Sequence, residues 1–102
     1  MKWEIIQAEM TFNKEDGYVG KVEFKVEGHK QPYEVALHSK RGRDWAYGLF
    51  FKNEAGPENE IELVEEELEE NDELYDELIE AARAVVVRDQ PEAKGSDSEE
   101  TE

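Results

Sequence analysis

Apolar and polar residues alternate through the first half of the chain, a pattern that predicts β-strands. Between residues 18 and 27, Val22, Phe24 and Val26 alternate with charged neighbours, as in a strand with one buried face and one solvated face. The same alternation predicts three further strands, over residues 3–12, 33–40 and 45–52.

Short turns join these predicted strands. Asp16 and Gly17 form a strong hairpin signal, because glycine accepts a positive φ at little cost. No connection among the four strands is long enough for a crossover between parallel strands. We therefore expect an antiparallel meander, in which each strand pairs with the next along the chain.

The second half of the chain repeats apolar residues at helical spacing between residues 58 and 88. Ile61, Leu68, Tyr75 and Ala82 recur every seven residues, which is typical of an amphipathic helix. One straight helix of this length would measure about 46 Å. An eight-residue strand spans only about 27 Å, so a single helix would overhang the sheet.

Asn71 offers a break in this pattern, because Asn is a good N-cap residue and acids follow it. We therefore favour two helices, over 58–70 and 72–88. One continuous helix is the alternative, because the seven-residue register continues past Asn71, and an Asn on such a seam can fix the register of a helix pair.

Together these patterns predict an α+β fold, a four-stranded antiparallel meander sheet with one or two C-terminal helices packed on one face. Residues 1–88 would form a single domain, and the polar, acidic residues 89–102 a disordered tail. The expected core consists of Ile6, Ala8, Met10, Phe12, Val22, Phe24, Val26, Tyr33, Val35, Leu37, Leu49, Phe51, Ile61, Leu68, Leu78 and Val85.

The net charge of −16 lies wholly in the second half of the 102-residue chain. Residues 1–56 hold nine Lys or Arg and nine Asp or Glu, whereas residues 57–102 hold three and nineteen. This imbalance argues against direct contact with nucleic acid or an anionic membrane, and it permits a basic protein partner. The chain has no cysteine and no apolar run of roughly 20 residues, so we expect a cytoplasmic protein.

The helical pattern places carboxylates on the side opposite its apolar stripe. Eight pairs of acids stand four residues apart and oppose helix formation by roughly 2–4 kcal/mol in total. One interpretation is a surface that binds a basic partner, with Glu65, Glu66, Glu69 and Glu73 as candidate contacts. Such a surface could also mimic nucleic-acid charge, as an inhibitor or decoy does. The other interpretation is that the acids only keep the protein soluble.

Large apolar residues occur on both predicted faces of the sheet, although the helices can cover one face only. We expect Trp3, Ile5 and Phe50 to contribute to an uncovered strip that binds a partner or forms a homodimer. The alternative is that loops or the tail cover this strip.

No residue pattern predicts catalysis, a cofactor or a metal ion. His29 and His38 lack metal-ligand spacing, and the helical acids lack the glycine-containing loop of a calcium site. Ser39 follows His38 directly, but adjacent strand residues point to opposite faces. The basic residues Lys40, Arg41 and Arg43 are typical of a solvated hairpin loop. We therefore predict a non-enzymatic binding or regulatory protein; a small ligand-binding domain with a deep pocket is the alternative.

Overall fold

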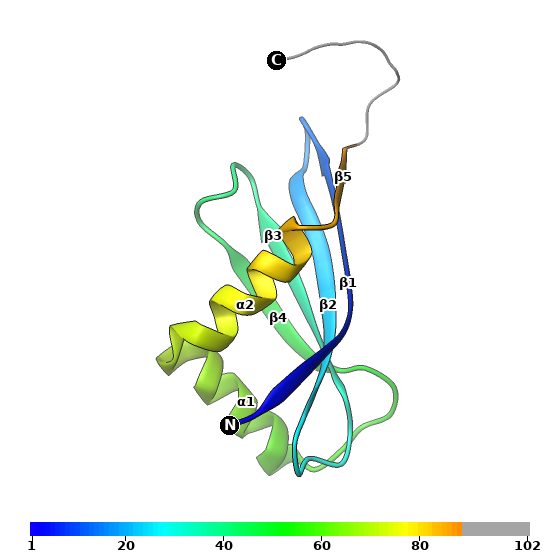
Figure 1. The fold of residues 1–102 in the computed structure, drawn as a ribbon, viewed down its shortest axis with the longest axis vertical. Coiled ribbons are helices and arrows are strands. Elements are labelled where there is room, and N and C mark those ends of the chain that lie inside the picture. The colour runs from blue at the N-terminus through cyan, green and yellow to red at the C-terminus, as the bar shows by residue number, and fades with distance from the viewer. Residues whose placement is uncertain (89–102) are drawn as a thin grey trace.

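A five-stranded sheet carries two helices on its concave face in the computed structural model, which describes residues 1–88 (Figure 1). The α+β class and the antiparallel meander of the first four strands are confirmed. The tail expected over 89–102 lies outside the described residues. The elements are β1 (Trp3–Asn13), β2 (Gly17–Val26), β3 (Tyr33–Ser39), β4 (Ala46–Phe51), α1 (Glu58–Glu70), α2 (Asp72–Arg83) and β5 (Val86–Arg88).

The sheet has the strand order β4-β3-β2-β1-β5, and its last strand was not predicted. The second helix was expected to reach residue 88, but α2 ends at Arg83 and Val86–Arg88 pairs in parallel with Met10–Phe12 of β1. The run of valines at 85–87 favours a strand, because β-branched side chains fit a pleated surface. The two helices supply the crossover that this parallel pair needs.

Asn71 separates the two helices, so the alternative of one continuous helix is wrong. Its backbone is extended, with φ −121° and ψ 106°. Its side-chain oxygen accepts a hydrogen bond from the Glu73 N–H at 3.0 Å, and its own N–H donates to the Glu67 carbonyl at 2.8 Å. One residue therefore closes α1 and caps α2.

A β-bulge in β1 overturns one core prediction. The register with β2 shifts between Ile5 and Gln7, and this irregularity leaves Ile6 48% exposed. Trp3 and Ile5 instead pack against the core, while Ala8 and Met10 keep their expected side beyond the bulge. A bulge changes which face a side chain takes, and alternation alone does not reveal it.

The core lies between the concave face of the sheet and the helices. Nine predicted core residues are buried: Met10, Val22, Phe24, Val26, Tyr33, Val35, Leu37, Leu68 and Leu78. Ala8, Leu49, Phe51 and Ile61 are partly buried and pack against them, and Phe12 is half-buried against the Tyr18 ring. Val85 is 45% exposed, because α2 ends before it, so its placement in the core was wrong. Four further residues complete the buried core: Val64, Leu74, Ile79 and Ala82.

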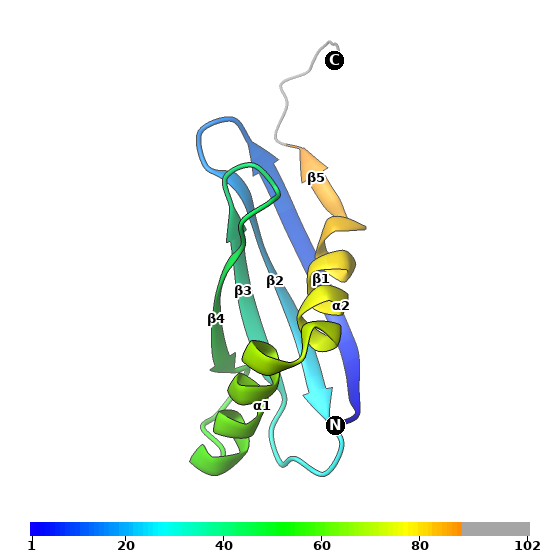
Figure 2. The ribbon, with the colours of Figure 1, turned by 90° about the vertical axis from the view of Figure 1, so that its left-hand side faces the viewer.

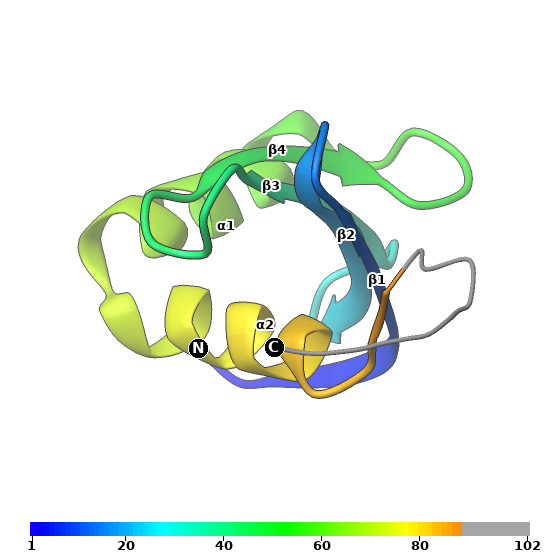
Figure 3. The ribbon, with the colours of Figure 1, turned by 90° about the horizontal axis from the view of Figure 1, so that it is seen from above.

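The sheet curves around the helices, as the view from above shows (Figure 3). Helix α1 packs against β4, whereas α2 packs against β1 and β2 (Figure 2). The apolar stripe of each helix therefore faces the sheet, and the carboxylates face outward. Within residues 1–88, no helix lies on the convex face of the sheet.

Candidate functional site: an acidic helix surface

The outward side of α1 and α2 is a nearly uninterrupted carboxylate surface, here called the acidic helix surface. Its only basic residue is Arg83, in the last turn of α2. Eleven acidic side chains on this surface are exposed: Glu58, Glu62, Glu65, Glu66, Glu69, Glu70, Asp72, Glu73, Asp76, Glu77 and Glu80.

Two further helical acids are less exposed and have structural partners. Glu60 Oε1 accepts the backbone N–H of Lys30 at 2.9 Å and so ties α1 to the loop between β2 and β3. Glu67 Oε2 accepts the side-chain amide of Asn71 at 2.7 Å and supports the helix break. These two acids contribute to the fold, whereas the eleven exposed acids face solvent.

Ion pairs among residues 1–88 lie on the sheet and not on the helices. Lys52 Nζ lies 3.3 Å from Glu23, and Lys25 Nζ lies 3.5 Å from Glu4. A third pair joins Lys21 to Glu34 at 3.8 Å. Within the described part of the chain, no cation is paired with the acidic helix surface, so its charge is uncompensated by the fold.

The break at Asn71 reduces the electrostatic cost of these acids. It places Asp72 and Glu73 in the first turn of a new helix, where the positive end of the helix dipole favours carboxylates. It also separates Glu69 from Glu73, which removes one of the eight like-charge pairs expected from the sequence. Seven pairs remain within helices and still oppose helix formation.

The helical carboxylates also act on tyrosines of the sheet. Burial raises the pKa of Tyr33 to about 12, and the Glu60 carboxylate adds to the rise. Burial likewise raises the pKa of Tyr47, with contributions from Glu69 and then Glu65. Because α1 packs against β4, the Glu65 and Glu69 carboxylates are near enough to disfavour a tyrosinate at Tyr47.

The four candidate partner contacts all lie exposed on the acidic helix surface. Glu65, Glu66 and Glu69 come from α1, with Glu65 and Glu69 one turn apart. Glu73 comes from the first turn of α2, on the other side of the break. The structure thus presents these four side chains to solvent on two consecutive helices.

The predicted apolar strip does not form, because its residues lie on opposite faces of the sheet. Trp3 and Ile5 pack against the core on the concave side. Phe50 is 54% exposed, and its ring lies on the convex side against Gly48, where an added Cβ would meet it at 3.0 Å. The sequence could not show this separation, since it depends on the bulge in β1.

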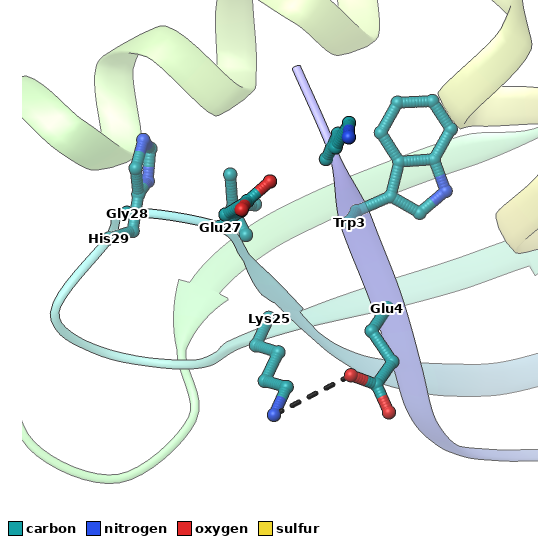
Figure 4. A pocket seen from close by; sticks show the side chains of 8 residues that line it. Trp3, Glu4, Lys25, Glu27, Gly28 and His29 are labelled. Atoms are coloured by element: carbon teal, nitrogen blue, oxygen red, sulfur yellow. Dashed lines mark ion pairs between the residues drawn. The ribbon is translucent and has the colours of Figure 1, made fainter.

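A hollow of about 500 Å³ lies where β1 begins and β2 ends (Figure 4). Trp3 and His29 point toward the helices, whereas the paired Lys25 and Glu4 lie on the other side of the strands. The lining groups therefore do not converge on a common point. This arrangement differs from the deep polar pocket that a ligand-binding domain would need.

The histidines and the buried serine have structural hydrogen bonds. His29 Nδ1 shares one with the Tyr33 hydroxyl at 2.7 Å, and His38 Nε2 donates to the Asp16 carbonyl at 2.9 Å. The Ser39 hydroxyl accepts the Gly42 N–H at 2.8 Å. Within residues 1–88 no three His, Cys, Asp or Glu side chains gather as metal ligands.

The basic loop between β3 and β4 extends from the end opposite α1 (Figure 1). Lys40 donates to the Glu15 carbonyl in the neighbouring hairpin, whereas Arg41 and Arg43 are exposed. No ion pair between this loop and the acidic helix surface exists among the described residues.

Comparison of the chain with protein-family models, with curated proteins and with solved structures gives no match. Among residues 1–88, no helix has the length and apolar character needed to cross a membrane.

Proposed function

We propose that this protein is a non-enzymatic binding or regulatory module whose acidic helix surface binds a basic protein partner. The observation that carries the proposal is the difference in charge compensation between the two faces. The sheet pairs Glu4, Glu23 and Glu34 with lysines, whereas the eleven exposed helical acids form no ion pair within the described chain.

Charge of one sign concentrated on one surface accelerates encounter with a partner of the opposite sign. The seven like-charge pairs also oppose the helices, by about 1–3 kcal/mol in total. A basic partner would relieve this repulsion when it binds, so the free energy stored in the free protein would favour the complex.

Pull-down from host lysate at low and high salt tests the proposal. The test variant replaces Glu65, Glu66, Glu69 and Glu73 by Gln. Its matched control carries the same change in charge on exposed acids outside the helices: Glu9, Glu15, Glu27 and Glu54. We expect a salt-sensitive partner that is lost from the helix variant and retained by the control.

If the helix variant still retains the partner, the binding site lies on the sheet and not on the helices. Absence of any partner at either salt concentration would leave the acidic helix surface as a device for solubility.

A further inference from the structure

Strand β4 forms an open edge of the sheet, since it stands last in the strand order and pairs with β3 alone. The Lys52 N–H donates to the Pro32 carbonyl at 3.0 Å, in register with the β3–β4 ladder. Backbone groups of an antiparallel strand face its two sides alternately. The N–H and C=O groups of Tyr47, Leu49 and Phe51 therefore point away from β3, where no strand lies among the described residues.

Strand β4 lacks three features by which proteins often prevent strand addition. Residues 46–51 contain no charge, no proline and no bulge. The opposite edge differs: β5 covers Met10–Phe12 of β1, and the remainder of β1 has a bulge after Ile5 and the charged residues Glu4 and Glu9. Bulges and charges of this kind protect edge strands, so β4 is the less protected of the two edges.

The acidic helix α1 lies against the same strand. Helix α1 packs against β4, and the Glu65 and Glu69 carboxylates act on the Tyr47 side chain. Both carboxylates are exposed. A second copy of this chain would bring its own α1 acids to the edge, which repulsion disfavours, whereas a basic segment would be attracted.

We propose that the basic partner adds an extended segment to the open edge of β4, with Lys or Arg alternating with apolar residues. This inference rests on the proposed function and names how its partner binds. Side chains of an added strand alternate between the two faces. On the concave side, cationic side chains lie along Tyr47 and Leu49 and reach Glu65 and Glu69. On the convex side, apolar side chains contact Phe50 and Gly48.

Backbone hydrogen bonds supply much of the affinity in this mode of recognition, and alternate side chains supply the specificity. In antiparallel pairing, directly opposite residues share a face. The residues that bond to Tyr47 and Leu49 are therefore the cationic ones, and the apolar residues turn their backbone groups outward.

The probe is a short peptide in which lysine and valine alternate. We expect the 102-residue protein to bind it at least about tenfold more tightly than a peptide of equal composition with its lysines in one block. N-methylation of the lysine amides removes the N–H donors that face β4. It should weaken binding of the alternating peptide by a similar factor, about tenfold. N-methylation of the valine amides should change binding little; the reverse dependence would indicate parallel pairing at the same edge.

Two protein variants locate the contact. Phe50→Lys places a charge on the edge strand. It should weaken binding of the alternating peptide about fivefold or more. Val19→Lys adds the same charge at a comparably exposed position of the inner strand β2 and should have little effect. Circular dichroism shows whether both variants keep the fold.

A second pair of variants tests the carboxylates. One double variant, Glu65→Gln with Glu69→Gln, removes two charges from α1. The other, Glu73→Gln with Glu77→Gln, removes two charges from α2. The α1 variant should weaken binding of the alternating peptide more than the α2 variant does.

The possible results separate this inference from the proposed function. Equal binding of alternating, blocked and N-methylated peptides would overturn strand addition and leave binding by charge alone. Equal loss with both N-methylated peptides, or equal effects of Phe50→Lys and Val19→Lys, would also overturn it. Failure of every basic peptide to bind would contradict both strand addition and the proposed binding of a basic partner.

Discussion

The sheet and the helices share one core but differ in how far their charges are compensated. Residues 1–56 hold equal numbers of acidic and basic residues, and three lysines of the sheet form ion pairs. The helices carry thirteen acids and one arginine. Because burial holds both regions in place, the unpaired charge of the helices is not a requirement of the fold.

The centre of the convex face shows how the sheet compensates like charges. Glu23 and Glu34 stand directly opposite each other on β2 and β3, an arrangement that is destabilising by itself. Lys52 lies beside the first and Lys21 beside the second. Comparable repulsion on the helices has no such compensation within residues 1–88, which is the difference that a basic partner would remove.

The largest expected effects come from the core that the two regions share. Phe24 on β2 and Leu74 on α2 are both fully buried. Phe24→Ala should lower the free energy of unfolding by about 3–5 kcal/mol, and Leu74→Ala by about 2–5 kcal/mol. Denaturant unfolding measures both, with exposed Val19→Ala as the control. A loss below about 1 kcal/mol for either buried residue would contradict a common core.

Salt should stabilise the protein, because it screens the helical acids more than it weakens three ion pairs. We expect a higher melting temperature in about 0.5 M salt than in about 0.01 M salt. Complete screening of the seven like-charge pairs would raise the free energy of unfolding by about 1–3 kcal/mol. Glu66→Gln with Asp76→Asn removes two pairs at each site and should reduce the salt effect. A melting temperature that falls with salt would show that attraction dominates.

The ion pairs of the sheet should differ in strength according to burial. Glu23 is 8% exposed, and its Oε1 atom accepts no hydrogen bond among the described residues, so the Lys52 charge is its main compensation. Lys52→Met should cost about 1–2 kcal/mol in urea unfolding. Lys25→Met disrupts an exposed pair and should cost less than about 1 kcal/mol. Equal losses would contradict this ranking.

The smallest expected effect is the contribution of the Glu60 carboxylate to the pKa of Tyr33. Its pKa is about 12 in the folded protein against 10.0 ordinarily, with burial as the larger cause. The unfolded chain therefore loses this proton first, and stability should fall between about pH 10 and pH 12 by up to about 1.4 kcal/mol per pH unit. Glu60→Gln should lower the pKa of Tyr33 slightly, as ultraviolet titration of tyrosinate measures. An unchanged pKa would mean that the carboxylate does not act on the ring.

Alternation and helical spacing were sufficient to predict most of the fold. Val22, Phe24 and Val26 are buried as expected, because strands β2 and β3 run without irregularity through the sheet. Asn71 separates the helices through the capping bonds that its side chain favours. These features depend on local chemistry, which a sequence displays directly.

The errors arose where tertiary pairing overrides a local pattern. The bulge places Ile6 outside and brings Trp3 and Ile5 to the core, which divides the expected apolar strip. β5 forms because β1 offers a free edge beside residues 86–88, although the helical register continued through Val85. Whether β4 is an edge strand likewise depends on the strand order, which the sequence does not show. The absence of charge from residues 46–51 can be seen in the sequence itself.

The most direct test of partner binding titrates a lysine-rich peptide into three proteins by calorimetry, at low and at moderate salt. The proteins are the wild type, the helix variant that replaces Glu65, Glu66, Glu69 and Glu73 by Gln, and the matched variant that replaces Glu9, Glu15, Glu27 and Glu54. We expect salt-sensitive binding that weakens at least about tenfold in the helix variant and changes little in the matched variant. Equal weakening in both variants would show that net charge alone attracts the peptide, and would contradict a binding site on the helices.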